Sequence, residues 1–145
     1  MDIRFQMEQF NACFCKITEL YREWAKKHGM SYNAMMTIYA LDQAHGHTTQ
    51  KQIADGWMIP KQTVNTIVKD LEKRGLVCFK ALPGSKQKAV CFTAEGKVFA
   101  ENCLHELYEM EDRVMQTIGR DACAAYLETG LAFAAALEQE VAQYE

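Results

Sequence analysis

The sequence contains little proline and no long apolar run, and both absences restrict what the protein can be. Only 2 of the 145 residues are proline, which favours long helices because proline interrupts them. No run reaches the roughly 18 apolar residues that a membrane-spanning helix needs. The first residues also lack the basic and apolar segments of a signal peptide. We therefore expect a cytoplasmic protein with no membrane partner.

Signatures of enzymes and of metal sites are also missing. The six cysteines include no CxxC pair, and without an export signal we expect them to be reduced thiols. The sequence has neither a glycine-rich phosphate loop nor a GxSxG motif. His105 and Glu109 have the i, i+4 spacing of metal ligands, but the second histidine of a zinc-protease helix is absent. We expect no enzymatic activity, no metal and no cofactor.

Acidic and basic residues are unevenly distributed along the chain. The length fits one compact domain, and the net charge of −3 alone argues against a nucleic-acid partner. Residues 47–97, however, hold nine basic and four acidic side chains, whereas residues 98–145 hold two and ten. A basic middle segment of this kind can attract an anion such as DNA phosphate.

The first segment has apolar residues at alternating steps of four and three. This spacing predicts one long helix with an apolar face that exceeds what one neighbouring helix needs, and it suggests packing against a second chain. A helix that packs only within its own chain is the alternative. Gly29 is expected to follow this helix, and Ser31 to cap a second one. The apolar positions are Ile3, Met7, Phe10, Phe14, Ile17, Tyr21 and Trp24.

The middle of the chain has the pattern of a helix-turn-helix followed by a hairpin. Thr49-Gln50-Lys51-Gln52 has the form of a capping box and predicts a helix over about residues 50–56. Pro60 suits the first turn of the next helix, which runs to about Arg74 before Gly75. Two short β-type runs, 76–79 and 89–92, then flank Pro83-Gly84-Ser85 and predict a hairpin rich in lysine. Two helices follow, separated by a break at Gly119-Arg120-Asp121, and the last ends near Tyr144.

Four stretches, in this order and at these separations, resemble the MarR family of bacterial transcriptional regulators. The resemblance implies a mainly α fold with a small β-hairpin, that is, a winged helix-turn-helix between N- and C-terminal dimerisation helices. It implies one compact domain with dimerisation helices at 1–29 and 94–145, a DNA-binding region at 30–93, a recognition helix at 60–74 and a wing at 76–93. The four stretches are Thr49-Gln50-Lys51-Gln52-Ile53-Ala54, Ile59-Pro60-Lys61-Gln62-Thr63-Val64, Leu71-Glu72-Lys73-Arg74-Gly75-Leu76-Val77 and Phe92-Thr93-Ala94-Glu95-Gly96.

The resemblance also implies a function. It indicates a sequence-specific regulator of transcription that binds double-stranded DNA at an inverted-repeat operator, as a homodimer formed through residues 1–28 and 98–144. Such a regulator is a repressor released by a small aromatic effector. Two alternatives remain open: a winged-helix protein-interaction module with weak DNA binding, and a cysteine-based redox sensor built on the same regulator. The wing departs from the family pattern, because Gly84 and Lys86 stand where the family usually has Asp and Arg.

Candidate site residues follow from the helical geometry and from the resemblance. At 100° per residue, the fourth helix turns a polar stripe away from its apolar face, and amide side chains on that stripe can bind adenine. Hydroxyls and lysines near helix N-termini suit phosphate. The predicted DNA contacts are Thr49, Lys51, Lys61, Gln62, Thr63, Asn65, Thr66, Lys69, Lys86 and Lys88. A possible effector pocket comprises Tyr21, Trp24, Met35, Met36 and Tyr39, which can equally be core residues. The candidate redox cysteines are Cys13 and Cys15.

Overall fold

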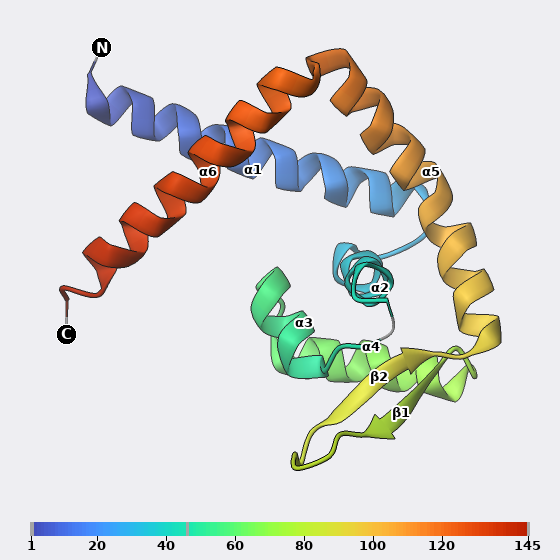
Figure 1. The fold of residues 1–145 in the computed structure, drawn as a ribbon. Helices are drawn as coiled ribbons and strands as arrows, with labels where there is room; N and C mark the ends of the chain where they lie inside the picture. The colour runs from blue at the N-terminus through green and yellow to red at the C-terminus, as the bar shows by residue number, and fades with distance from the viewer. Residues whose placement is uncertain (1, 46, 145) are drawn as a thin grey trace. The chain divides into compact units, whose positions relative to one another are not determined.

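The computed structural model describes residues 2–45 and 47–144, and its elements are those of a winged helix (Figure 1). Gly46, in the loop expected at residues 45–47, lies outside the described residues. Six helices and one two-stranded antiparallel hairpin confirm the mainly α fold with a small hairpin. In chain order they are α1 (Ile3–Lys27), α2 (Tyr32–Gln43), α3 (Gln50–Trp57), α4 (Lys61–Lys73), β1 (Val77–Ala81), β2 (Lys88–Phe92), α5 (Ala94–Ile118) and α6 (Arg120–Val141).

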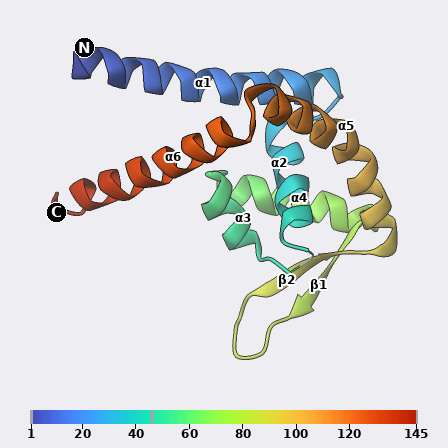
Figure 2. The ribbon, with the colours of Figure 1, turned by 45° about the horizontal axis from the view of Figure 1, so that its top comes forward.

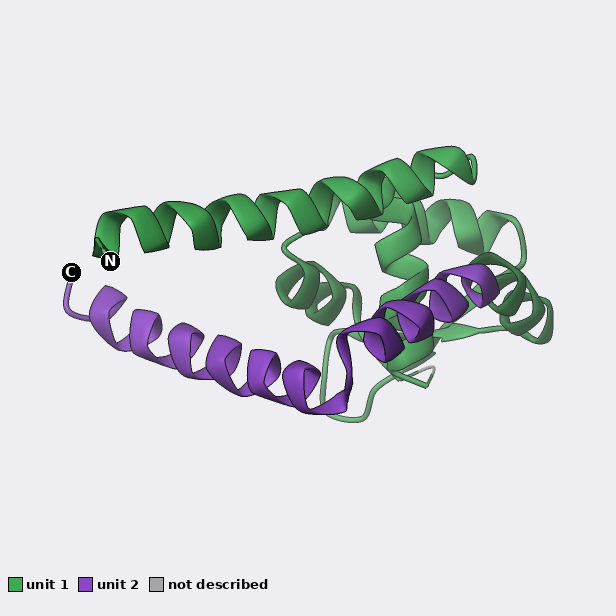
Figure 3. Ribbon diagram, turned by 90° about the horizontal axis from the view of Figure 1, so that it is seen from above, with its two compact units in different colours: residues 1–103 green, residues 104–145 purple. Residues whose placement is uncertain are grey.

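The chain divides into two compact units (Figure 3). The first, residues 1–103, contains α1 to α4, the hairpin and the start of α5. The second, residues 104–145, contains the rest of α5 and all of α6. Within the first unit, the hairpin extends beyond α3 and α4 (Figure 2).

The helix ends form where the sequence predicts them. The Thr49 hydroxyl accepts a hydrogen bond from the Gln52 amide at 3.1 Å, and the Gln52 side chain accepts one from the Thr49 amide at 3.1 Å. This reciprocal pair is the predicted capping box. Gly29 and Gly75 have φ of +71° and +74°, the left-handed conformation that ends α1 and α4. The Ser31 side chain caps α2 through the amide of Ala34.

Two boundaries differ from the predictions. Pro60 has extended backbone angles, φ −55° and ψ 136°, so it is the N-cap of α4 rather than a residue of its first turn. Helix α6 ends at Val141, three residues before Tyr144, and the backbone continues as a short turn. The shift at Pro60 is one residue and lies within the one or two residues by which helix ends vary, whereas the three-residue shift at the end of α6 exceeds that range.

The core of the first unit lies among α2, α4 and the hairpin. Its fully buried side chains include Met35, Ile38 and Leu41 of α2 together with Val64 and Val68 of α4. These positions recur three and four residues apart, the spacing of an amphipathic helix. The predicted apolar face of α4 is therefore confirmed. Because this face is buried, the opposite face of the helix is directed toward solvent.

The segment before α3 pairs with strand β2 of the hairpin through one residue. The Val90 amide donates to the Thr48 carbonyl at 2.7 Å, and Thr48 pairs with Val90 in antiparallel fashion. This bridge joins the wing to the start of the helix-turn-helix. The sequence did not indicate it, because a single bridging residue has no alternating pattern.

Candidate nucleic-acid interface

Helices α3 and α4 and the hairpin surround one open groove of about 520 Å³. Three structural elements that are distant in sequence contribute polar side chains to it. Six of the predicted DNA contacts line the groove, and three other residues that the sequence did not single out join them. The lining residues are Thr49, Gln50, Lys51, Lys61, Gln62, Asn65, Phe79, Gln87 and Lys88.

Helix α4 contributes Lys61, Gln62 and Asn65 to this groove, whereas Thr66 and Lys69 of its polar stripe do not line it. The Gln62 and Lys69 side chains are exposed and Asn65 is half-buried, on the side opposite buried Val64 and Val68. Exposed amides on a helix can form paired hydrogen bonds with the edge of adenine. The Thr66 hydroxyl instead donates to the Gln62 carbonyl at 2.9 Å, so it is already engaged within the helix.

The start of α3 contributes an ion pair. The Lys51 ammonium lies 2.9 Å from a carboxylate oxygen of Asp55, one turn along the helix, and both side chains are exposed. The hydrogen bond between them lowers the pKa of the Asp55 carboxyl and raises the pKa of Lys51. Thr49, predicted to bind phosphate, is only 7% exposed and its hydroxyl caps the helix. A contact from Thr49 to DNA would therefore use a small part of its surface.

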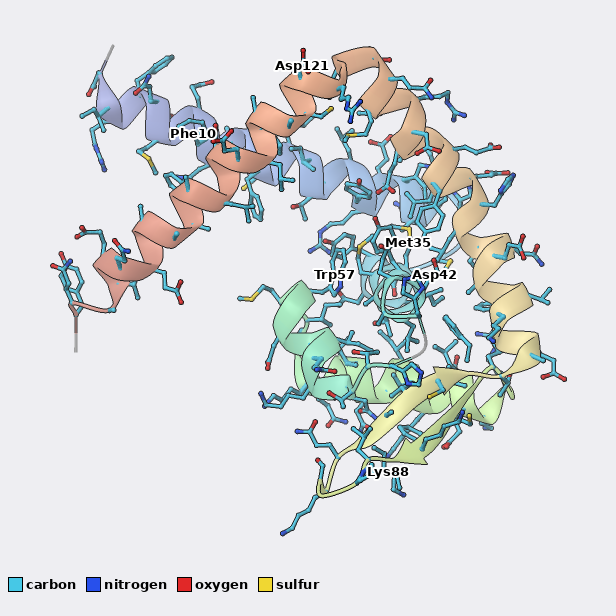
Figure 4. The ribbon with its side chains drawn as sticks, in the orientation of Figure 1. Phe10, Met35, Asp42, Trp57, Lys88 and Asp121 are labelled. Atoms are coloured by element: carbon cyan, nitrogen blue, oxygen red, sulfur yellow. The ribbon has the colours of Figure 1, made fainter. Side chains whose placement is uncertain are left out.

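The hairpin between β1 and β2 forms a cationic wing. The strands pair from Val77 opposite Phe92 to Ala81 opposite Lys88. Lys86 and Lys88 are exposed, and Lys88 lies on the hairpin in Figure 4. Gly84 has φ +74°, the left-handed conformation that turns the chain at the tip. No acidic residue lies between positions 73 and 94, so the wing carries positive charge alone.

Comparison with known proteins agrees with this geometry. The model of the MarR family matches residues 28–87. The structure of NMB1585, a MarR family regulator from Neisseria meningitidis, is similar over 100% of both chains, with a TM-score of 0.84 and 25% sequence identity. The chain therefore resembles the MarR family in sequence over residues 28–87 and in fold over its whole length.

Two more distant MarR-like folds come from Staphylococcus aureus. MepR in complex with DNA is 14% identical, with a TM-score of 0.63 over 94% of this chain and 98% of its own. MarR in complex with salicylate and kanamycin is 19% identical, with a TM-score of 0.68 over 95% of each chain. No curated protein matches the sequence. Among the residues that the structure describes, no helix has the length and apolar character needed to cross a membrane.

The predicted effector residues lie in different surroundings. Met35 and Met36 are buried in the core, which fits the core interpretation for these two. The Trp24 ring stacks on His28 with ring centroids 3.6 Å apart. The Tyr39 ring meets the edge of Trp57 at 5.3 Å, and Figure 4 shows Met35 and Trp57 in the first unit. Only the half-buried aromatic rings, including Tyr21, have surface available for a ligand.

The remaining candidates do not form a shared site. Cys13 and Cys15 are both exposed on α1. His105 contacts Glu109 through Nε2 and Oε1 at 3.2 Å, which is an ion pair along one helix when the imidazole is protonated. Within residues 2–45 and 47–144, no three His, Cys, Asp or Glu side chains are grouped so as to hold a metal ion.

The first and last helices of the chain, α1 and α6, expose large apolar side chains. Helix α6 has no buried residue along its 22 positions. On α1, Phe14 is 72% exposed although it belongs to the predicted apolar face. Other exposed apolar side chains on the two helices are Ile3, Phe5, Phe10, Ile17, Leu20, Tyr126, Leu127, Leu131, Phe133, Leu137 and Val141.

Proposed function

We propose that the protein acts as a homodimer whose two winged regions bind the two halves of an inverted-repeat operator. The observation that carries this proposal is the groove, in which amide and ammonium groups from α3, α4 and the wing converge. A groove lined with donors of this kind matches the edges of base pairs and the phosphates that flank them.

In this proposal α4 occupies the major groove of DNA. Gln62 and Asn65 read base edges, because their amides offer both a donor and an acceptor to adenine. Lys61, at the start of α4, and Lys69 bind phosphates on either side. Thr63 lies in the first turn of α4, where backbone amides are free to bind an anion.

The wing supplies a second contact, in the minor groove. Lys86 and Lys88 extend from a hairpin that carries no acidic residue. Lysine is a compact charge without the planar fork of arginine, so it binds phosphates and the narrow groove without reading bases bidentately. The wing therefore adds affinity more than sequence preference.

The second copy of the chain covers the apolar faces of α1 and α6. A monomer seldom exposes so many large apolar side chains on adjacent turns of a helix, and α6 buries none of its residues within one chain. Alanines at 132, 134, 135 and 136 permit close approach of another helix. The ten acidic side chains of residues 98–145 suit a dimer region held away from DNA.

We further propose that the regulator is a repressor and that a small aromatic effector releases it. Tyr21, Trp24 and Tyr39 offer half-buried rings in the first unit, and stacked rings are suitable surfaces for a planar ligand. The similar MarR structure from Staphylococcus aureus holds salicylate, which makes salicylate a reasonable first probe. Its addition should weaken operator binding, and Trp24→Leu should reduce that response while leaving the unliganded affinity unchanged.

Footprinting on DNA upstream of the protein's own gene tests the dimeric mode of binding. We expect two protected half-sites related by two-fold symmetry, with centres about one helical turn, roughly 10 base pairs, apart or a multiple of it. Protection of a single half-site at saturating protein, or uniform protection along the fragment, would contradict the proposal.

A further inference from the structure

Two cysteines face each other across the base of the wing. In the antiparallel register of β1 and β2, Cys78 is the direct partner of Cys91. Side chains of directly opposed residues lie on the same face of a sheet. Both cysteines are free thiols, Cys78 half-buried and Cys91 5% exposed.

The backbone hydrogen bonds define the type of this pair. The Val90 amide donates to Thr48, which lies beyond the far edge of β2. Because successive residues of a strand direct their backbone groups to opposite sides, Cys91 directs its amide and carbonyl toward β1. Cys78 and Cys91 are thus a hydrogen-bonded pair, with a Cα separation of about 5.5 Å. Disulfides span about 4.4–6.8 Å between Cα atoms, so the backbone already has the required spacing.

We propose that Cys78 and Cys91 are a site of reversible oxidation by low-molecular-weight disulfides. The Cys78 thiolate attacks one sulfur of the external disulfide, forming a mixed disulfide and releasing the first small thiol. The Cys91 thiolate then attacks the Cys78 sulfur and releases the second small thiol. The two protein thiols are oxidised to one disulfide, and the external disulfide is reduced to two thiols that take up the protons. Cys78 reacts first because it is the more exposed of the two.

The new bond would change the shape of the wing. Directly opposed side chains in a sheet have Cβ atoms about 4.5–5.5 Å apart, whereas a disulfide needs about 3.8 Å. Oxidation therefore draws the two strands together at the base of the wing, and the resulting strain makes the bond easy to reduce. Phe79 and Lys88, which line the groove, lie one and three residues from the bonded positions. On the proposed mode of DNA binding, this displacement lowers operator affinity.

Peptide mapping tests the chemical part of the proposal without any DNA. The full-length protein is incubated with oxidised glutathione, alkylated and digested with trypsin. Cleavage after lysine and arginine places Cys78 alone in residues 75–80 and Cys91 alone in residues 89–97. We expect these two peptides to be linked, and dithiothreitol to separate them. Recovery of both peptides unlinked, as free or glutathione-bound cysteines, would overturn the proposal.

Operator affinity tests the consequence for the wing, which rests on the proposed function. Oxidation should weaken binding several-fold in the natural protein, and reduction should restore it. Cys78→Ser should remove this response, whereas Cys15→Ser, which removes an exposed cysteine on α1, should retain it. If Cys78 and Cys91 become linked but operator affinity is unchanged, the proposed effect on binding is refuted. If the reduced protein binds no DNA, that result instead counts against the proposed function. The peptide map still shows independently whether Cys78 and Cys91 form a disulfide.

Discussion

Gly96, in the first turns of α5, lies against the backbone of the wing. A Cβ at this position would sit 1.7 Å from the Leu76 carbonyl oxygen, far inside van der Waals contact. Close by, the Thr93 hydroxyl donates to the Gly75 carbonyl and accepts from the Gly96 amide at 3.0 Å. Glycine at 96 therefore allows α5 to begin directly beside the end of α4.

Substitution of Gly96 by alanine should destabilise the protein. The Leu76 carbonyl belongs to the backbone and cannot rotate away, so the clash must be relieved by moving α5 or the wing, at a cost of about 1–3 kcal/mol. The measurement is the free energy of unfolding in urea. Gly56→Ala is the matched control, because Gly56 is also helical and nothing lies within 4 Å of its added Cβ. That control should be neutral or stabilising by up to about 1 kcal/mol, and equal effects at both positions would contradict the close approach.

Asp55 should weaken DNA binding through its ion pair with Lys51. The carboxylate lies 2.9 Å from the ammonium and adds a negative charge beside the groove. Asp55→Asn should raise DNA affinity and steepen its dependence on salt by about one counterion, because Lys51 becomes available to phosphate. Anisotropy titrations at several salt concentrations measure both effects. Glu101→Gln makes the same charge change on α5 and should leave binding unaltered; a similar gain there would implicate net charge alone.

Helix α4 and the wing should make different contributions to recognition. Gln62→Ala removes an amide from the polar stripe and should change which operator sequence is preferred, with about 1–3 kcal/mol of discrimination lost at the base it contacts. The measurement is a binding selection from randomised operators. An unchanged preferred sequence would contradict the placement of α4 in the major groove.

Lys86→Ala, in contrast, should weaken binding to all sequences about equally. The change removes one phosphate contact, so the salt slope should decrease by about one. Lys86→Arg retains the charge and should keep the slope, and it can add contacts in the minor groove through its planar fork. If Lys86→Ala and the natural protein have the same affinity at every salt concentration, the wing does not contact DNA.

Local patterns predicted most of these elements from sequence. The capping box at Thr49, the left-handed glycines at 29 and 75, and the apolar period of α4 all depend on residues within a few positions of each other. The bridge between Thr48 and Val90 and the register that opposes Cys78 to Cys91 depend on contacts between distant segments. The sequence also predicted several of the polar residues that line the groove. It did not predict Phe79 and Gln87, because these residues line the groove only once the wing has folded beside α4.

At the scale of the whole molecule, the exposed apolar faces of α1 and α6 predict a dimer. Leu131 is 63% exposed on α6, so Leu131→Lys should leave a single chain folded while it disfavours association. Sedimentation velocity at micromolar concentration should show a dimer for the natural protein and a shift toward monomer for this variant. Met58→Lys is the control, because Met58 is 89% exposed and lies between α3 and α4. This variant should still sediment as a dimer. A natural protein that sediments as a monomer would contradict the dimer.

The distribution of charge explains how an acidic chain can bind an anion. The net charge is −3, yet residues 47–97 carry nine basic and four acidic side chains, and these residues contain the helix-turn-helix and the wing. Phosphate affinity depends on this local surplus rather than on the total. The proposed DNA binding should therefore be sensitive to salt and should use the winged region.

Fluorescence anisotropy with labelled DNA from the protein's own promoter tests this account most directly. The titration is performed with and without excess unrelated DNA, at about 50 and 200 mM salt. We predict tight binding that survives the competitor and that weakens steeply at the higher salt concentration. Binding that the unrelated DNA abolishes, or an absence of binding at low salt, would contradict the central claim that the groove between α3, α4 and the wing reads a specific operator.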